Sequence, residues 1–440
     1  MRTRKCGYAL VTLAMIATAV LAPGATPSAH ATVAPFGDEF LWGVASSGFQ
    51  SEGHAPDSNW TRYIDSGEAG DEYQNSVDFL NRHPSDIDLA ARLGVQVYRI
   101  GIEWARLQPE PGVWDASAFR FYDDVIDRIV AAGMRPMLTL DHWVYPGWVS
   151  DRGGWRNPGI VEDWLANMRK VVDRYASRNP LWVTFNEPAA YVGTELRIGA
   201  ITVDEAPAML DRMAQAHNTI YDIIHHAAPD AQVTSNLGYV AGAETEVNQP
   251  MVDRIADKLD FIGVDYYFAV LPESGQSVQG GSNQGPAIWE LPIRTEGIYY
   301  ALRHYARLFP DRPLYVVENG MPTENAGQRA DGYTRSEHLR DTVYWLQRAK
   351  ADGIDLIGYN YWSLTDNYEW GSYTPRFGLY TVDVRTDPTL ARRPTDAVDT
   401  YRTIIRSGGV PTGYRPTRPP AECELVDPPE SCDQTVGLPD

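Results

Sequence analysis

Short apolar runs alternate along the chain with longer segments in which apolar residues recur at helical spacing. Runs rich in β-branched and aromatic residues are typical of buried strands, whereas a period of three to four residues is typical of an amphipathic helix. The pattern predicts eight strands, at residues 40–47, 97–104, 135–143, 181–188, 232–239, 260–267, 314–320 and 356–364.

Four segments between or after these strands have clear helical periodicity. Residues 118–133 end in a glycine of the kind that closes helices, and residues 160–176 precede the fourth strand. Residues 336–353 precede the eighth strand, with Ser336 predicted as the N-cap, and a last helix is expected near residues 395–409.

This alternation of strands and helices predicts a parallel sheet of the α/β class. Eight strands, each followed by a helix, describe a closed (β/α)8 barrel, a TIM barrel, which we expect as a single domain over residues 32–409. A doubly wound open sheet is the alternative. It usually has a glycine-rich phosphate loop after its first strand, and none follows residues 40–47.

The first 31 residues differ from the rest of the chain. The segment begins with basic residues, a mostly apolar stretch runs from Tyr8 to Ala22, and Ala29-His30-Ala31 has the form of a cleavage site. These features are typical of a secretory signal peptide, so we expect a secreted, extracellular protein that begins near Thr32. The apolar stretch is shorter than the roughly 20 residues of a membrane-spanning helix.

Residues 410–440 contain seven prolines and are predicted to form an extended tail beyond the barrel. Of the three cysteines, Cys6 would leave with the signal peptide. The remaining pair, Cys423 and Cys432, suggests one disulfide in an oxidising compartment. With no other cysteine and few clustered histidines, we expect neither a metal site nor a cofactor.

Composition and charge narrow the classes of partner. Apolar residues make up 43% of the chain and charged residues 22%, as in an ordinary globular protein. The formal charge is −20, which disfavours nucleic acids and anionic membranes and favours a neutral small-molecule substrate. Aromatic residues reach 11%, which suits a surface that stacks on sugar rings, although a large core would explain much of this content.

In a (β/α)8 barrel the active site lies at the carboxyl ends of the strands. Polar or aromatic residues end or follow nearly every predicted strand. They are Gln50, Glu52, Arg99, Glu103, His142, Trp143, Asn186, Glu187, Tyr266, Tyr267, Glu318, Asn319, Trp362, Glu369 and Trp370.

Glu187 and Glu318 stand out, because the fourth and seventh strands of such a barrel lie roughly opposite each other. Facing carboxylates serve glycoside hydrolysis: one protonates the leaving oxygen, and the other supports the charge at the anomeric carbon. A separation of roughly 5–5.5 Å gives a covalent intermediate and retention, and one of about 6.5–9.5 Å gives inversion. The spacing along the chain leaves both outcomes open.

Each of these residues also has a purely structural reading. Asn186-Glu187-Pro188 could be a strand end before a proline-started helix, and Glu318-Asn319 could begin a turn. Arg99 and Glu103 share strand parity, which favours a structural ion pair. Alternatively, the permanent charge of Arg99 would keep a neighbouring nucleophile ionised. The conjunction of all these strand ends favours function.

These residues resemble glycoside hydrolase family 1, the β-glucosidase and β-galactosidase family, from about residue 40 to about residue 405. The matching stretches are FLWGVASSGFQSEG, YRIGIEWARLQPEPG, TLDHW, TFNEP, VVENG and WSLTDNYEW. The resemblance implies that Glu187 is the acid/base and Glu318 the nucleophile. It further implies sugar-hydroxyl contacts from Gln50, His142, Asn186, Glu369 and Trp370, a stacking platform from Trp362, and contacts to the nucleophile from Tyr267 and Arg99.

We therefore expect a retaining β-glycosidase, foremost a β-glucosidase, acting on unphosphorylated β-D-glycosides by double displacement. The pair Glu369-Trp370 is the family pattern for unphosphorylated sugars, whereas Asp265 stands where most members have asparagine. A transglycosidase of the same fold, or a non-catalytic sugar-binding member, is the alternative. The oligomeric state is left open.

Overall fold

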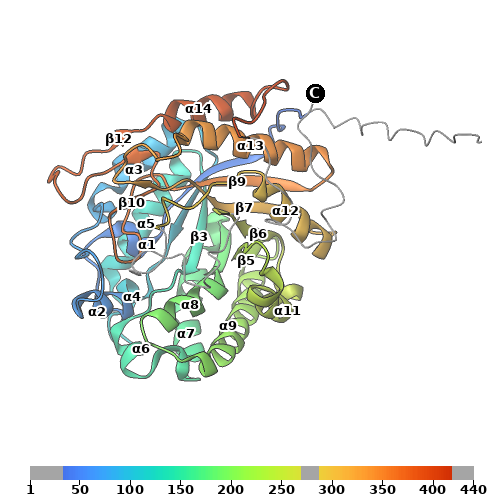
Figure 1. Cartoon of the computed structure of the whole chain (residues 1–440). Coiled ribbons are helices and arrows are strands. Elements are labelled where there is room, and N and C mark those ends of the chain that lie inside the picture. Colours follow the sequence, from blue (N-terminus) through green and yellow to red (C-terminus); the bar gives the residue numbers. More distant parts are fainter. Residues whose placement is uncertain (1–32, 269–286, 419–440) are drawn as a thin grey trace, which may run out of the picture.

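The computed structural model describes residues 33–268 and 287–418 (Figure 1). The predicted signal peptide and the predicted Cys423–Cys432 disulfide lie outside the described residues. Within those residues, no helix is both long and apolar enough to cross a membrane.

Eight parallel strands close into a barrel, and all eight correspond to predicted strands. In Figure 1 the strands form the centre of the molecule, and the long helices surround them. Each strand pairs with the next, and the last pairs with the first, so the sheet has no free edge. The strands are β1 Leu41–Ala45, β2 Val97–Gly101, β3 Arg135–Asp141, β4 Leu181–Asn186, β5 Gln232–Gly238, β6 Ile262–Asp265, β7 Leu314–Asn319 and β9 Leu356–Trp362.

The four predicted helices are confirmed as α5 (Ala116–Ala131), α7 (Ile160–Tyr175), α13 (Arg335–Ala351) and α14 (Ala397–Ser407). The others are α1 Gly48–Glu52, α2 Asn59–Asp65, α3 Phe79–Leu93, α4 Trp104–Leu107, α6 Gly147–Asp151, α8 Pro188–Arg197, α9 Ala206–Ala227, α10 Glu244–Val247, α11 Gln249–Ile255 and α12 Gly297–Leu308. Two-residue strands pair outside the barrel: β8 Thr323–Glu324 with β10 Pro375–Arg376, and β11 Tyr380–Thr381 with β12 Arg393–Pro394.

The predicted cap of α13 was wrong by two residues. Thr334, not Ser336, accepts a hydrogen bond from the backbone N–H of Glu337, and the Glu337 carboxylate accepts from the backbone N–H of Thr334. This reciprocal pair needs a threonine three positions before a glutamate, a spacing that Ser336 does not have. Ser336 instead shares a hydrogen bond of 2.6 Å with Thr400 of α14.

The first residues of the predicted tail pack on the barrel, so that prediction was wrong for residues 410–418. Val410 is 2% exposed, and its backbone N–H donates to Gln347 Oε1 at 2.8 Å. The Tyr414 hydroxyl and the backbone N–H of Thr417 both donate to Asp341 Oδ1, at 2.6 and 2.9 Å. These contacts supply a buried carboxylate of α13 with the partners that its burial requires.

An apolar cluster fills the lower part of the barrel interior. It includes residues from early and central positions of several strands: Val97, Met137, Leu181, Val183, Phe261, Tyr315 and Val317. Polar side chains lie above it at the carboxyl ends of the strands. The fold thus places its charged interior groups at one end of the barrel.

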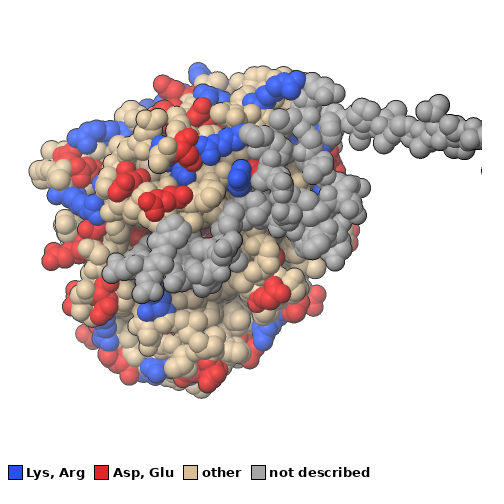
Figure 2. Space-filling view, in the orientation of Figure 1, with Lys and Arg blue, Asp and Glu red and all other residues tan. Residues whose placement is uncertain are grey.

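On the outer surface in Figure 2, acidic and basic side chains are interspersed over the part that the structure describes.

Candidate active site

Arg99 of β2 lies at the centre of the barrel mouth and is completely buried. Its guanidinium donates to Thr139 Oγ1 at 2.9 Å, to Asn186 Oδ1 at 2.7 Å and to Glu318 Oε1. The ion pair with Glu103 favoured by strand parity was wrong. Glu103 follows the end of β2 and accepts from the backbone N–H of Phe49 at 2.8 Å, whereas Arg99 pairs with Glu318.

Both carboxylate oxygens of Glu318 have strong donors. Oε1 accepts from Arg99, and Oε2 accepts from the Tyr267 hydroxyl at 2.8 Å. Bonds from a permanent cation and a hydroxyl favour the ionised form of a carboxyl group. Burial and the charge of Glu318 raise the pKa of Tyr267 well above its usual value, so the phenol keeps its proton and remains a donor.

Glu187 follows β4 in a left-handed conformation, with φ at 39°, and begins α8. Gly238 at the end of β5 leaves room for its carboxyl, because a Cβ there would lie 2.3 Å from Glu187 Oε1. Burial, reinforced by the negative charge of Glu318 and opposed by Arg99, raises the pKa of Glu187 to about 8. The two glutamates therefore differ in environment: Glu318 accepts from a permanent cation and a phenol, and Glu187 holds a proton that it can donate.

A second group of predicted residues forms one connected wall. Gln50 Nε2 donates to Glu369 Oε2 at 3.1 Å, and Trp362 Nε1 donates to Glu369 Oε1 at 3.4 Å. The ring of His142 stacks against Trp362 and Trp370, with centroids 5.9 and 5.7 Å apart. Amides and carboxyls beside flat aromatic faces offer the hydrogen bonds and the stacking surface that a sugar requires.

Among the predicted site residues, two buried polar atoms have no hydrogen-bond partner within the described part of the chain. They are Nδ1 of His142 and Nδ2 of Asn186. Burial and the charge of Arg99 lower the pKa of His142 well below its usual value, so its ring is neutral. Since buried polar groups are nearly always bonded, these atoms are suited to meet the hydroxyls of a ligand.

The ten residues to which the resemblance assigned a role thus all lie at the same end of the barrel, in two groups. The groups are electrostatically coupled, because the charge of Glu318 contributes to the raised pKa of both Glu187 and Glu369. The sequence interpretation missed Asn236 of β5, whose Nδ2 donates to Asn186 Oδ1 at 2.7 Å. Asn236 lies near the end of a predicted strand, so the rule that selected the other residues would also have found it.

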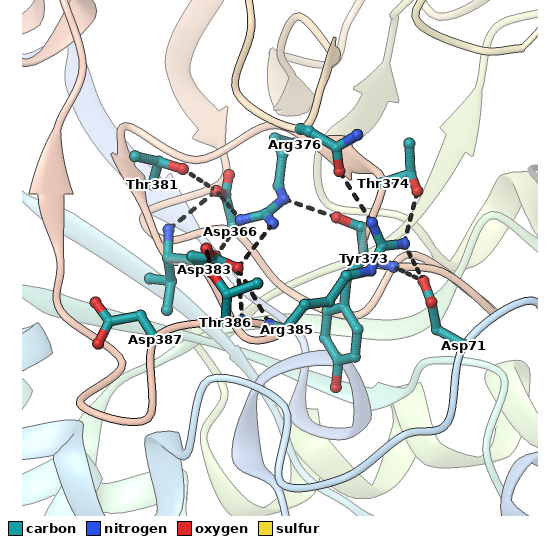
Figure 3. Close-up of polar contacts among 12 residues, drawn as sticks. Asp71, Asp366, Tyr373, Thr374, Arg376, Thr381, Asp383, Arg385, Thr386 and Asp387 are labelled. Atoms are coloured by element: carbon teal, nitrogen blue, oxygen red, sulfur yellow. Dashed lines mark hydrogen bonds and ion pairs between the residues drawn. The ribbon is translucent and has the colours of Figure 1, made fainter.

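The loop that carries Glu369 and Trp370 is held by two carboxylates, as Figure 3 shows. Asp366, which is buried, accepts from Arg376 and Thr381 of the same loop. Asp71, from the segment after α2, accepts from the backbone N–H of Tyr373 at 2.8 Å and from Arg385. The loop is therefore fixed before any ligand arrives, which lowers the cost of ordering it.

Two acids of the site give the free protein an alkaline limit of stability. Burial is the main cause that raises the pKa of Glu187 and that of Glu369 to about 8, from 4.5 in an unfolded chain. Because the folded state keeps protons that the unfolded state releases, this stabilisation is fully present below about pH 4.5 and is lost as the pH rises through about 8. We expect scanning calorimetry to show Tm falling by several degrees from about pH 6 to about pH 9.

A double variant, Glu187→Gln with Glu369→Gln, should make this part of the curve less steep, since neither amide titrates. Glu110→Gln, which alters an exposed carboxylate, serves as the matched control and should follow the unmodified protein. A double variant whose Tm falls as steeply as that of the control would contradict the assignment.

Across residues 33–268 and 287–418, no group of three or more His, Cys, Asp or Glu side chains is arranged to hold a metal ion. What the site offers is a carboxyl group paired with an arginine, a second buried carboxyl group with a raised pKa and a wall of sugar-compatible groups. This arrangement can carry out acid-assisted displacement at an acetal carbon.

Comparison with known proteins agrees with this chemistry. Residues 32–240 and 231–410 match a family model described as Glycosyl hydrolase family 1. β-Glucosidase A of Thermotoga maritima is 27% identical over 455 residues, which cover 86% of this chain and 99% of that protein. The galactolipid galactosyltransferase SFR2 of Arabidopsis thaliana is 29% identical over 77% of this chain and 59% of its own length.

Solved structures resemble the fold over the same extent. A β-glycosidase from Pyrococcus horikoshii superposes with a TM-score of 0.75 at 27% identity, covering 86% of this chain and 96% of that one. A β-glucosidase from Thermotoga maritima in complex with castanospermine shares the fold, with a TM-score of 0.75 at 24% identity.

Proposed function

The chain belongs to glycosyl hydrolase family 1, and we propose that it is a retaining β-glycosidase, foremost a β-glucosidase. The observation that supports this most directly is the contrast between Glu318 and Glu187. Arg99 and Tyr267 donate to both oxygens of Glu318, whereas burial keeps the proton on Glu187. Retaining hydrolysis needs such a division between an anionic nucleophile and a neutral acid.

In the first step a Glu318 oxygen attacks the anomeric carbon while the bond to the leaving oxygen breaks. Glu187 transfers its proton to that oxygen, and a glycosyl ester forms on Glu318. In the second step Glu187, now ionised, takes a proton from water as the water oxygen attacks the same carbon. Glu318 leaves as a carboxylate, and the sugar keeps its β configuration.

The glycone is proposed to be an unphosphorylated sugar. The wall formed by Gln50, Glu369 and Trp362 offers amide, carboxyl and indole groups, which suit hydroxyls. A phosphate would need cationic side chains or a cluster of backbone N–H donors. β-Glucosidase relatives such as that of Thermotoga maritima support glucose as the first substrate to test.

Time-resolved proton NMR of the protein with p-nitrophenyl β-D-glucoside tests the proposal. We expect β-glucose to appear first, followed by the α anomer through mutarotation. If α-glucose appears first, the protein inverts and Glu318 is not the nucleophile. If the glucoside and the galactoside both bind without release of sugar, the non-catalytic sugar-binding alternative is correct.

Transfer to an alcohol or another sugar is a second candidate, because one relative is named a galactolipid galactosyltransferase. The covalent intermediate is the same, and the difference lies in which molecule attacks it. Product analysis with added methanol or with a galactolipid acceptor separates the two. Hydrolysis predicts free sugar as the main product, and transferase activity predicts the new glycoside.

We also propose that the protein is exported, on the basis of the basic, apolar and small-residue segments within residues 1–31. N-terminal sequencing of protein secreted by its source cells should give a start near Thr32. Peptide mapping without reduction should recover Cys423 joined to Cys432. An intact N-terminus on the secreted chain would contradict the first expectation, and free thiols would contradict the second.

A further inference from the structure

A third carboxyl group, that of Asp265, lies beside the two catalytic glutamates. Asp265 is the last residue of β6, pairs in register with Glu318 of β7 and is 1% exposed. Its backbone oxygen accepts from Tyr239, which pins the strand end to the segment after β5. The side chain is therefore a fixed part of the barrel mouth.

Asp265 is linked to the sugar-facing amide of Asn186 through one intermediate residue. Nδ2 of Asn236 donates both to Asp265 Oδ2 and to Asn186 Oδ1. Asn186 Oδ1 also accepts from Arg99, so both donors hold the oxygen side of the amide. Nδ2 of Asn186 is therefore turned away from these donors, and it has no partner within the described part of the chain.

If Glu187, Asp265 and Glu318 were all ionised, the barrel mouth would carry three negative charges against the one positive charge of Arg99. Arg99 supplies one positive charge and pairs with Glu318. Neither Glu187 nor Asp265 forms an ion pair with any described residue. An unpaired buried carboxylate is costly, and such a group takes up a proton instead. Burial and the charges of Glu318 and Glu187 raise the pKa of Asp265 well above its usual value.

Other titratable groups around Asp265 do not offset this deficit. Burial raises the pKa of Tyr267 and of Tyr305 well above the usual value, so both are neutral. Glu244 accepts from Tyr305 and would only add negative charge. The titratable and charged side chains near Asp265 and its contacts are thus Arg99, Glu187, Tyr239, Glu244, Tyr266, Tyr267, His304, Tyr305 and Glu318.

We propose that Asp265 functions as a neutral carboxylic acid, which positions Asn236 and, through it, Asn186 without adding charge to the catalytic centre. Oδ2 accepts from Asn236, so the proton is assigned to Oδ1, which has no partner among the described residues. Asp265 is therefore a positioning residue that acts through the bond accepted by Oδ2. This inference deepens the proposed glycosidase function, on which the role of Asn186 rests.

Infrared spectroscopy of the resting protein at neutral pH tests the protonation state without any turnover. The carbonyl band of a protonated carboxyl group should disappear in Asp265→Asn, and a separate band should disappear in Glu187→Gln. Asp265→Ser removes the same band and serves if the asparagine variant does not fold. If every protonated-acid band persists in both Asp265 variants, the proposal is overturned, whether or not the protein hydrolyses glucosides.

The pH profile of kcat/KM gives a second test, because it reports the charge of Asp265, which a merely structural role would leave unspecified. If Asp265 is neutral, Asp265→Asn removes no charge, so the alkaline midpoint set by Glu187 stays in place. If Asp265 is ionised, the same change removes a negative neighbour and shifts that midpoint to lower pH, which would overturn the proposal. Asp265→Ala should lower kcat/KM by about 10- to 100-fold, and asparagine should restore part of the loss.

Discussion

We expect Glu318→Ala to lower kcat for p-nitrophenyl β-D-glucoside by about four to six orders of magnitude. The change removes the atom that bonds to the anomeric carbon. It also removes one acceptor of Arg99 and the carboxylate to which the Tyr267 hydroxyl donates. Steady-state assays at saturating substrate measure the loss. The fold should survive, because Glu318 lies above the apolar cluster that fills the barrel.

External azide or formate should restore part of the activity of this variant, because a small anion fits the space left by the carboxylate. Attack from that side gives a product of inverted configuration, which NMR identifies as the α-glycosyl azide. Glu324→Ala is the matched control, because its side chain is exposed on β8, the strand that follows β7 in the chain. Full activity in Glu318→Ala, or loss of equal size in the control, would refute the assignment of the nucleophile.

The second large effect is expected for Glu187→Ala, and its size should depend on the leaving group. General acid catalysis contributes about 10²- to 10⁴-fold. For cellobiose, whose leaving alkoxide needs a proton, kcat/KM should fall by this amount. For a dinitrophenyl glucoside, whose leaving group departs without one, it should fall much less. Equal losses for both substrates would contradict the acid role.

The pH profile distinguishes this role from a merely structural one. Glu187 must hold its proton to act as the acid, and its pKa is about 8. Activity of the unmodified protein toward cellobiose should therefore be lost as the pH rises through about 8. In Glu187→Gln the residual activity should not show this alkaline loss, since the amide cannot ionise. An unchanged midpoint in the variant would assign the loss to another group.

Much of the fold could be predicted because its signals are local. Eight apolar runs separated by helical segments leave few topologies other than a closed barrel, and all eight became barrel strands. The site residues followed from a general property of that barrel, that its parallel strands all end at one rim. Asn236 satisfied the same rule and was overlooked, although its amide bonds directly to Asn186.

Apart from the misplaced cap of α13, the errors concern contacts between residues far apart in the chain. Strand parity favoured Glu103 as the partner of Arg99, but the residue that pairs with Arg99 is Glu318, 219 positions away. Residues 410–418 were assigned to a free tail because their own composition is rich in proline. They are ordered by Asp341 and Gln347 of α13, which no local pattern identifies as their partners.

The sequence by itself determined the barrel, the rim on which its polar strand ends meet and the two glutamates proposed to act there. Only the tertiary structure decided which way those side chains point. Val317 packs in the interior cluster, so strict alternation would turn Glu318 outward, yet Glu318 bonds to Arg99 inside the barrel. Register shifts in β7, and in β4 before Asn186, bring these residues inward. Such shifts arise from closing eight twisted strands into one ring, and the hydrophobic pattern of a single strand does not encode that constraint.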